Sequence, residues 1–379
     1  MRFSEVKKVI DEGLAGNNPS LYTGFKRLGQ HISIRRNAYH LIGSNSGAGK
    51  SAFADNFYIL NPIRWLLKER AEGKTDVKYK VYLWAMERKK EHRYAKWVCQ
   101  RLFQKYGILM DVELLLTLNT QRNRMPQELY DKVMELQEEI DAMGDMVEVF
   151  ERDNPTGIYH VAKNLLLNNH GTLVNSLDNN GQPIKLTINN EVKYKKEFKY
   201  HNDREIVVIY IDHLQVLKGE SRDKIQLSKK ELVDKMDEYL HTLRDKWSCM
   251  CVAVSQFNRE SHQLGRRTGD LDLAPQENDF RDSSRPYDSC DVAIGMLNPY
   301  KYQDYSHLGY DIHAFTSPFS GANMFRALYV LKNSFGADNI AFGNLFYGEN
   351  GMYKELPKPA ETSELEKFYN IVKTAKGIS

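Results

Sequence analysis

The spacing of apolar residues along the chain predicts helices that alternate with strands. Apolar residues recur at helical spacing from Phe3 to Leu14, which predicts a short amphipathic helix over residues 3–14. Short, continuous apolar runs predict buried strands, and they lie at residues 38–43, 77–85, 206–211, 251–254, 292–296, 327–331 and 340–346. Helical patterns separate the earlier strands, at residues 52–60, 88–106, 158–167 and 232–247. Strands that alternate with helices favour an α/β fold, with a mainly parallel sheet flanked by crossover helices.

One segment departs from this alternation. Residues 171–203 are rich in Asn, Lys and Thr, and the turn signals Asn180-Gly181 and Asn189-Asn190 separate segments of alternating polarity. This pattern predicts a β-hairpin insertion into the α/β fold. Lysines interleave with aromatic residues from Lys193 to Tyr200. That pattern suits single-stranded nucleic acid, and it also suits the charged edge of a surface hairpin.

Composition places the chain among soluble globular proteins. Of its 379 residues, 41% are hydrophobic and 27% are charged, and the net charge is +3. Such a balance gives no global basic field, so any contact with nucleic acid has to come from local clusters. No apolar run reaches the ~18 residues of a membrane span, and the four scattered cysteines do not form a disulfide framework. We therefore expect a cytoplasmic protein with no membrane partner.

The strongest chemical signal lies directly after the first predicted strand. It reads Ser44-Asn45-Ser46-Gly47-Ala48-Gly49-Lys50-Ser51, which matches the phosphate-loop pattern GxxxxGK[ST] except that Ser44 replaces the first glycine. In such a loop, backbone N–H groups hold phosphate oxygens, the lysine reaches the β- and γ-phosphates, and the serine hydroxyl binds Mg²⁺. We therefore predict that residues 44–51 bind ATP, with Lys50 also catalytic and Ser51 a metal ligand. The alternative is a plain glycine-rich turn between strand and helix.

Three further residues follow predicted strands and are candidates to complete such a site. Asp212 ends the run 206–211, and ligands bind at the carboxyl ends of strands in open α/β sheets, so Asp212 is the second predicted Mg²⁺ ligand. Glu87 follows the strand 77–85 as a candidate general base, or as a carboxylate that stabilises a helix N-terminus. Gln256 follows the strand 251–254, where its amide either senses the γ-phosphate or caps the strand.

Six ordered motifs of this sequence resemble those of the DnaB-type replicative helicases, the hexameric RecA-like ATPases of bacteria and phages. They are Thr23-Gly24-Phe25, the phosphate loop, Ala85-Met86-Glu87, Ile211-Asp212-His213-Leu214-Gln215, Ser255-Gln256-Phe257-Asn258-Arg259 and Asp279-Phe280-Arg281-Asp282-Ser283. The resemblance runs from about residue 14 to 356, with the stretch 107–203 poorly matched. It implies a RecA-like motor domain at residues 19–356 and a linker helix at 1–18. Beyond it, the pattern from Ser363 to Lys376, with Ser363 as its cap, predicts a tail helix within residues 357–379.

The resemblance also implies an activity and partners. A DnaB-type motor hydrolyses ATP with Mg²⁺ at the interfaces of a homo-hexameric ring, translocates along single-stranded DNA and unwinds duplex DNA during replication. In that motor Glu87 is the base, Gln256 couples the γ-phosphate to DNA, and a primase or helicase loader is a further partner. By position, the DNA loops carry the basic residues Lys218, Arg222, Lys224, Arg259, Arg266 and Arg267. Such residues neutralise phosphates without reading sequence, although a solvated loop has the same composition.

The sequence departs from the family where one subunit reaches into its neighbour. The family carries Lys-x-Arg-x-Gly there, and this chain carries Lys332-Asn333-Ser334-Phe335-Gly336. Lys332 remains a catalytic candidate in trans, but serine cannot supply an arginine's charge. Either Lys332 suffices, or Arg326 or Arg285 substitutes, or hydrolysis is slow. Two rivals to a helicase therefore stay open, namely an ATP-gated DNA-binding scaffold and another RecA-like ATPase without unwinding activity.

Overall fold

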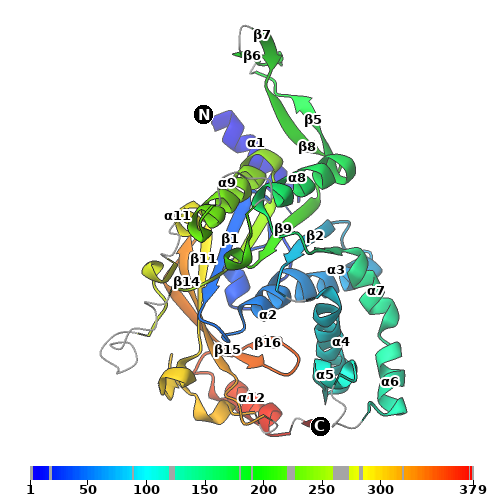
Figure 1. The fold of residues 1–379 in the computed structure, drawn as a ribbon, viewed down its shortest axis with the longest axis vertical. Helices are drawn as coiled ribbons and strands as arrows, with labels where there is room; N and C mark the ends of the chain where they lie inside the picture. Colours follow the sequence, from blue (N-terminus) through cyan, green and yellow to red (C-terminus); the bar gives the residue numbers. More distant parts are fainter. Residues whose placement is uncertain are drawn as a thin grey trace.

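The body of the protein is one nine-stranded sheet with helices on both faces (Figure 1). The computed structural model describes residues 3–16, 19–87, 89–118, 124–178, 181–188, 191–219, 227–258, 273–280, 285–317, 320–374 and 376–377. The strand order is β16-β15-β14-β11-β1-β10-β9-β2-β4. The predicted α/β fold is therefore confirmed.

Six neighbouring strands of this sheet run parallel to one another. They are β11 (Val292–Leu297), β1 (Ala38–Ser44), β10 (Met250–Gln256), β9 (Glu205–Asp212), β2 (Lys78–Ala85) and β4 (Val147–Phe150). Every residue of β1 and β9 is buried, which explains why the sequence shows these strands as continuous apolar runs. We call the side of the sheet where these strands finish its carboxyl end, and the side where they start its amino end.

The remaining three strands are antiparallel. β14 (Phe325–Asn333), β15 (Ile340–Tyr347) and β16 (Met352–Glu355) form a meander that extends the sheet from β11. The apolar runs predicted β14 and β15 but not their direction, because burial on both faces looks the same in either orientation. The short connection at 334–339 permits only antiparallel pairing, and β16 has no apolar run to mark it.

Hydrophobic clusters fill the space between the sheet and its helices. Successive residues of a strand point to opposite faces. Ile42 belongs to the cluster that includes α2 (Lys50–Asp55) and α3 (Asn61–Ala71), and Leu41 to the one that includes α8 (Pro155–Leu165) and α9 (Lys229–Trp247). The other α-helices formed by the described residues are α1 (Phe3–Leu14), α4 (Lys90–Tyr106), α5 (Val112–Leu115), α6 (Gln127–Met134), α7 (Gln137–Asp145), α11 (Arg285–Ser289) and α12 (Thr362–Thr374).

The cysteines belong to this packed interior. All four are buried and unbridged, and burial raises the pKa of the Cys99 and Cys249 thiols to about 12. They are therefore inert packing residues rather than nucleophiles at neutral pH. Among the described residues, no helix combines the length and the apolar character that crossing a membrane requires.

The predicted insertion forms a β-ribbon that projects from the body (Figure 1). β5 (Gly171–Asn175) pairs with β8 (Lys196–Tyr200) at its base, and β6 (Lys185–Ile188) pairs with β7 (Glu191–Tyr194) at its tip. Phe198 anchors the base, because its ring lies 5.3 Å from that of Trp247 on α9. The side chains of β7 are all exposed. The tip therefore adds nothing to the core.

We predict that the tip can be removed without loss of stability. Replacing residues 177–194 by Asn-Gly joins Ser176 to Lys195, whose backbones are already hydrogen-bonded at 2.8 Å, through a favoured two-residue turn. The melting temperature should change by less than about 2 °C, measured by calorimetry. As a control, Phe198→Ala at the buried base should cost about 3 kcal/mol. A large drop on removing the tip would mean that it belongs to the folding core.

Candidate functional site

The phosphate loop connects β1 to α2 at the carboxyl end of the sheet. Gly47 and Gly49 have φ angles of 78° and 88°, in the left-handed region that favours glycine. A Cβ at Gly47 would lie 2.8 Å from Nζ of Lys301, and one at Gly49 would lie 2.6 Å from the hydroxyl of Tyr353. Backbone conformation therefore requires both glycines, and crowding against Tyr353 adds to the requirement at Gly49.

Residues far along the chain hold the loop in shape. Lys301 donates from Nζ to the carbonyl of Ser46 at 3.0 Å, and the Tyr353 hydroxyl donates to the carbonyl of Ala48 at 2.7 Å. These two bonds fix the carbonyls of Ser46 and Ala48 in place. Neither Lys301 nor Tyr353 could be found from the sequence, because neither belongs to a recognisable motif.

A cavity of about 380 Å³ lies against this loop. It is bounded by residues from the ends of β2, β9 and β10 and from α4. Of the residues predicted for the site, those that line it are Ser46, Gly47, Gly49, Lys50, Ser51, Glu87, Asp212 and Gln256. Ser44, Asn45 and Ala48 do not line it, because Ser44 is buried in β1 and the other two face the protein.

Ser51 and Asp212 meet as a Mg²⁺ site requires. The Ser51 hydroxyl donates to Oδ1 of Asp212 at 2.8 Å. A hydroxyl and a carboxylate are oxygen ligands of the kind that Mg²⁺ takes while it keeps several waters. The two residues present therefore fit a magnesium ion bound with ATP phosphates.

Arg93 is a part of this site that the sequence did not reveal. Its guanidinium lies buried between two carboxylates, donating to Oδ2 of Asp212 at 2.8 Å and to Oδ2 of Asp55 at 2.8 Å. Burial lowers the pKa of Arg93, but the two carboxylates outweigh it and leave that pKa well above its usual value. Burial raises the pKa of Asp55, and Arg93 opposes the rise. Arg93, Asp55 and Asp212 thus form a buried cluster in which the arginine's positive charge offsets the repulsion between the two carboxylates.

Glu87 is also held by a neighbour. Its Oε1 lies 2.6 Å from Nε2 of His213, which must carry a proton to face a carboxylate. His213 is buried, whereas the Glu87 side chain is 52% exposed toward the cavity. On the other side of the ring, Nδ1 lies 3.3 Å from the backbone nitrogen and 3.2 Å from Oε1 of Gln215. A fixed residue thus positions an exposed carboxylate.

Gln215 links this arrangement to the end of β10. Its Nε2 donates to the Ser255 hydroxyl at 2.8 Å and to the carbonyl of Gln256 at 3.2 Å, and its Oε1 accepts from the backbone N–H of Gln256 at 3.0 Å. Contacts therefore run without a break across the carboxyl ends of β2, β9 and β10. The exposed Gln256 side chain lines the cavity beside them.

Lys50 points into the same cavity. Burial lowers the pKa of its ammonium group, and the nearby carboxylates of Asp212 and Glu87 oppose that shift. A lysine in this setting has a strong electrostatic preference for added negative charge, because the cavity shields it from water. This is the property that a phosphate-binding lysine needs.

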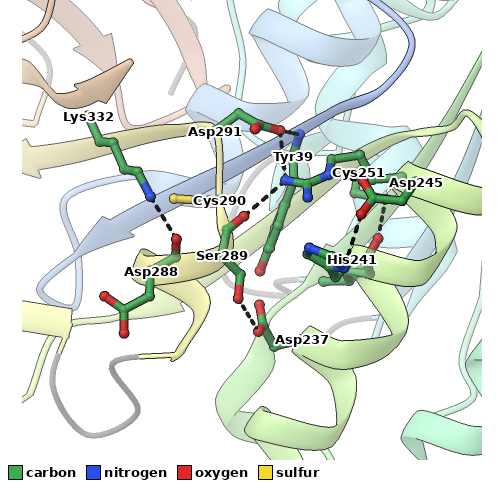
Figure 2. A network of polar contacts seen from close by, with 12 residues as sticks. Tyr39, Asp237, His241, Asp245, Cys251, Asp288, Ser289, Cys290, Asp291 and Lys332 are labelled. Carbon is green, nitrogen blue, oxygen red and sulfur yellow. Dashed lines mark hydrogen bonds and ion pairs between the residues drawn. The ribbon is translucent and has the colours of Figure 1, made fainter. Parts of the chain in front are cut away.

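Lys332 does not line this cavity, and its side chain is directed at Asp288 (Figure 2). It stands near the end of β14, and its Nζ donates to the carbonyls of Tyr287 at 2.9 Å and Asp288 at 2.8 Å in α11. The Ser289 hydroxyl on the same helix donates to Oδ2 of the buried Asp237 at 2.7 Å. Within one chain, Lys332 therefore holds α11.

The two arginines considered as substitutes for Ser334 are also engaged. Arg326 is buried, and its Nη1 donates to the carbonyls of Asn323 at 2.9 Å and Phe325 at 2.7 Å. Arg285 is exposed and pairs with Glu238 at 2.6 Å. These contacts place neither arginine where it could replace the one missing at Ser334.

Five of the six candidate DNA-binding residues lie outside the described residues, namely Arg222, Lys224, Arg259, Arg266 and Arg267. Lys218 is described and exposed, and its Nζ forms an ion pair with Asp153 at 2.8 Å. Its role in binding DNA stays a prediction.

We predict that Arg93 stabilises the fold around this site. Arg93→Met leaves two carboxylates buried without their partner, which should lower the free energy of unfolding by about 3–5 kcal/mol in urea denaturation at pH 7. The control is Arg101→Met, which breaks the partly exposed ion pair with Glu139 and should cost less than about 1 kcal/mol. Adding Asp55→Asn to Arg93→Met should recover part of the loss. Equal small losses for Arg93→Met and Arg101→Met would contradict this account.

Comparisons of sequence find no relative, and comparisons of structure find several. No protein-family model and no curated protein matches the sequence. The ATPase domain of a phage helicase superposes with a TM-score of 0.59 at 16% identity, over 94% of this chain and 99% of that one. A DnaB-like replicative helicase, solved in a study of its interactions with primase, superposes with a TM-score of 0.58 at 16% identity.

The second comparison covers 92% of this chain and 66% of the helicase chain. Identities this low establish the fold alone, and both superpositions extend over nearly all of the present chain. The resemblance indicated by the six motifs is thereby confirmed at the level of the fold. The chain has the RecA-like α/β fold of the ATPase domains of DnaB-like replicative helicases.

Proposed function

We propose that this protein is an ATP-dependent, ring-shaped DNA helicase that translocates on single-stranded DNA during replication. One observation carries the proposal. Lys50 and Ser51 of the phosphate loop face Asp212 and Glu87 across one cavity of about 380 Å³. A phosphate-binding lysine, a pair of magnesium ligands and a carboxylate base are the parts that hydrolysis of a nucleoside triphosphate requires.

Each residue has a distinct role in this proposal. The loop amides and Lys50 bind the β- and γ-phosphates. Ser51 and Asp212 hold Mg²⁺, which when bound neutralises charge on those phosphates. Glu87, oriented by His213, takes the proton of the attacking water. Gln256 lines the cavity at the end of β10, and in this proposal its amide reports the state of the γ-phosphate.

The proposal extends to the organisation of the chain. We assign residues 19–356 to the motor, 1–18 to a linker helix and 357–379 to a tail, and we place the protein in the cytoplasm. Basic residues of the segments 218–224 and 259–267 would contact the DNA backbone, since charged loops bind single strands without reading sequence. A primase or a helicase loader would be a further partner, as in the study of the DnaB-like helicase.

Assembly into a ring is supported by two surfaces that do not meet within one chain. α1 exposes an apolar stripe of Phe3, Val6, Ile10 and Leu14. An open, largely apolar groove of about 630 Å³ lies between α4, α5, α6 and β4, lined by Tyr94, Ala95, Val98, Leu115, Leu116, Val133, Val147 and Val149 together with Lys90, Glu91 and Glu148. We propose that α1 of one copy docks in the groove of the next. Head-to-tail contacts of this kind form a ring when the rotation between successive copies closes.

Ser334 favours a second candidate function, in which the protein binds ATP and DNA without unwinding. Without an arginine at this position, ATP binding could drive assembly on DNA with little turnover, and the protein would act as an ATP-gated scaffold or as another kind of RecA-like ATPase. Strand separation discriminates between these functions. Stimulation of ATPase by single-stranded DNA together with unwinding of a forked duplex supports the helicase, and stimulation without unwinding supports the scaffold.

Glu87→Gln should separate binding from chemistry. The variant keeps the shape of the side chain but loses the base, so turnover of ATP should fall by about 10²–10⁴-fold while ATP binding is retained. Lys50→Ala should abolish turnover by weakening phosphate binding. Glu364→Gln is the matched control, because Glu364 is an exposed carboxylate of α12 that lines neither the nucleotide cavity nor the groove. Wild-type turnover in Glu87→Gln would remove Glu87 as the base.

Charge on the stripe of α1 should prevent assembly. Ile10→Glu combined with Leu14→Glu places two carboxylates against the groove, so mass photometry with ATP and single-stranded DNA should find monomers. Leu116→Glu, on the groove side, should have the same effect. Lys7→Gln alters an exposed side chain of α1 outside the stripe and should leave the ring intact. Rings that persist in both stripe and groove variants would rule out this interface.

A further inference from the structure

The proposed reaction lacks a positive charge that a neighbouring copy should supply. In phosphoryl transfer an arginine that reaches the γ-phosphate neutralises charge in the transition state and contributes about 10³–10⁵ in rate. Ser334 stands where that arginine is expected. Any substitute has to lie near Ser334 in space, although it need not be near in sequence.

Arg35 is in that place. Its guanidinium carbon lies 3.3 Å from the centroid of the Phe335 ring, directly after Ser334. Asn333 also donates to the carbonyl of His31 at 3.1 Å, so the segment before β1 is tied to the turn after β14. Phe335 is 42% exposed and Arg35 is half-buried, which places the stacked pair at the surface.

Among the described residues, none occupies the N–H donors of the Arg35 guanidinium. Stacking on an aromatic ring uses the face of the guanidinium and leaves the N–H groups at its edge. Within the described residues Arg35 makes no hydrogen bond or ion pair. Asp291, the carboxylate that acts on it electrostatically, is engaged by Arg244 at 3.1 Å and by the backbone N–H of Tyr39 at 2.8 Å.

The adjacent arginine shows the contrast. Arg36 donates to the carbonyls of Glu205 and Asn202, the latter at 2.8 Å, and lies over the ring of Tyr200. Its donors are used for structure, as are those of Arg326 and Arg285. Arg35 therefore differs from every arginine that has been considered for this role.

The location of Arg35 excludes a role in its own cavity. Asn333 pairs with Val292 at the start of β11, and Ser44 pairs with Met296 near the end of β11. The turn after β14 and Arg35 thus lie at the amino end of the sheet, whereas the nucleotide cavity lies at its carboxyl end. Copies joined head to tail present opposite sides to each other, so Arg35 is on the side that can serve a neighbour.

We propose that Arg35 binds the γ-phosphate of ATP held by the neighbouring copy, in place of the arginine missing at Ser334. This inference rests on the proposed ATPase. As water forms a bond to the γ-phosphorus, the bond to the oxygen shared with ADP breaks, and the proton of the water passes to Glu87. Arg35 takes no proton; its charge and N–H groups stabilise the negative γ-phosphoryl oxygens. In this proposal, stacking on Phe335 keeps the long side chain of Arg35 extended for this contact.

Substitution of Arg35 is the first test. Arg35→Gln should lower kcat for ATP by about 10³-fold or more, with binding of a fluorescent ATP analogue and ring size unchanged. Arg204→Gln is the control, since Arg204 is an arginine at the amino end of β9 that pairs with Asp76, and it should turn over ATP like the wild type. Adding Ser334→Arg to Arg35→Gln should restore turnover. Failure of that rescue, or full activity of Arg35→Gln, would overturn the inference.

Mixing two inactive variants tests whether the contact is made in trans. Lys50→Ala lacks a working phosphate loop but keeps Arg35, and Arg35→Gln has the reverse defect. In randomly mixed rings about a quarter of the interfaces combine an intact loop with an intact Arg35, so turnover should reappear on mixing. A structural role for Arg35 gives no recovery and overturns the inference. If the wild type itself does not hydrolyse ATP, the proposed function fails as well, which distinguishes the two.

Discussion

The cluster of Arg93 with Asp55 and Asp212 is the interaction on which the nucleotide cavity depends. Asp212 ends the central strand β9, Asp55 ends α2 after the phosphate loop, and Arg93 belongs to α4. Two carboxylates buried this close repel each other and resist ionisation unless a cation lies between them. By holding both, Arg93 fixes α2 and α4 against β9 and keeps Asp212 turned toward Ser51. The positions of α2 and of the proposed magnesium ligands Ser51 and Asp212 therefore depend on one buried cation.

Local sequence motifs predict much of the candidate site and much of the fold. Continuous apolar runs predicted β1, β9 and β10, because strands that are buried on both faces consist mainly of apolar residues without alternating polar ones. The Gly-Lys-Ser signal was readable for a similar reason, since left-handed glycines and a lysine at the start of a helix constrain neighbouring positions. Chemistry confined to a few consecutive residues can be predicted from the sequence alone.

Contacts between distant residues could not be predicted in this way. Lys301 and Tyr353 support the phosphate loop across 255 and 305 positions, and no spacing rule links such residues. In the sequence, Arg93 is one charged position of an amphipathic helix, and its partners Asp55 and Asp212 are distant along the chain. His213 stood in a recognised motif, yet its bond to Glu87 depends on β2 and β9 being neighbours in the sheet. The sequence therefore predicts the motifs but not the tertiary contacts that position their side chains.

The two ends of the sheet divide the proposed reaction between copies of the chain. Lys50, Ser51, Asp212 and Glu87 gather at the carboxyl end, where the parallel strands finish. The antiparallel return of β14 carries Ser334 to the amino end, beside the segment that leads into β1 and bears Arg35. A single copy therefore cannot bring its own arginine to its own phosphate without breaking the sheet. If hydrolysis needs that charge, turnover has to follow assembly, and the separation by strand direction prevents an isolated subunit from consuming ATP.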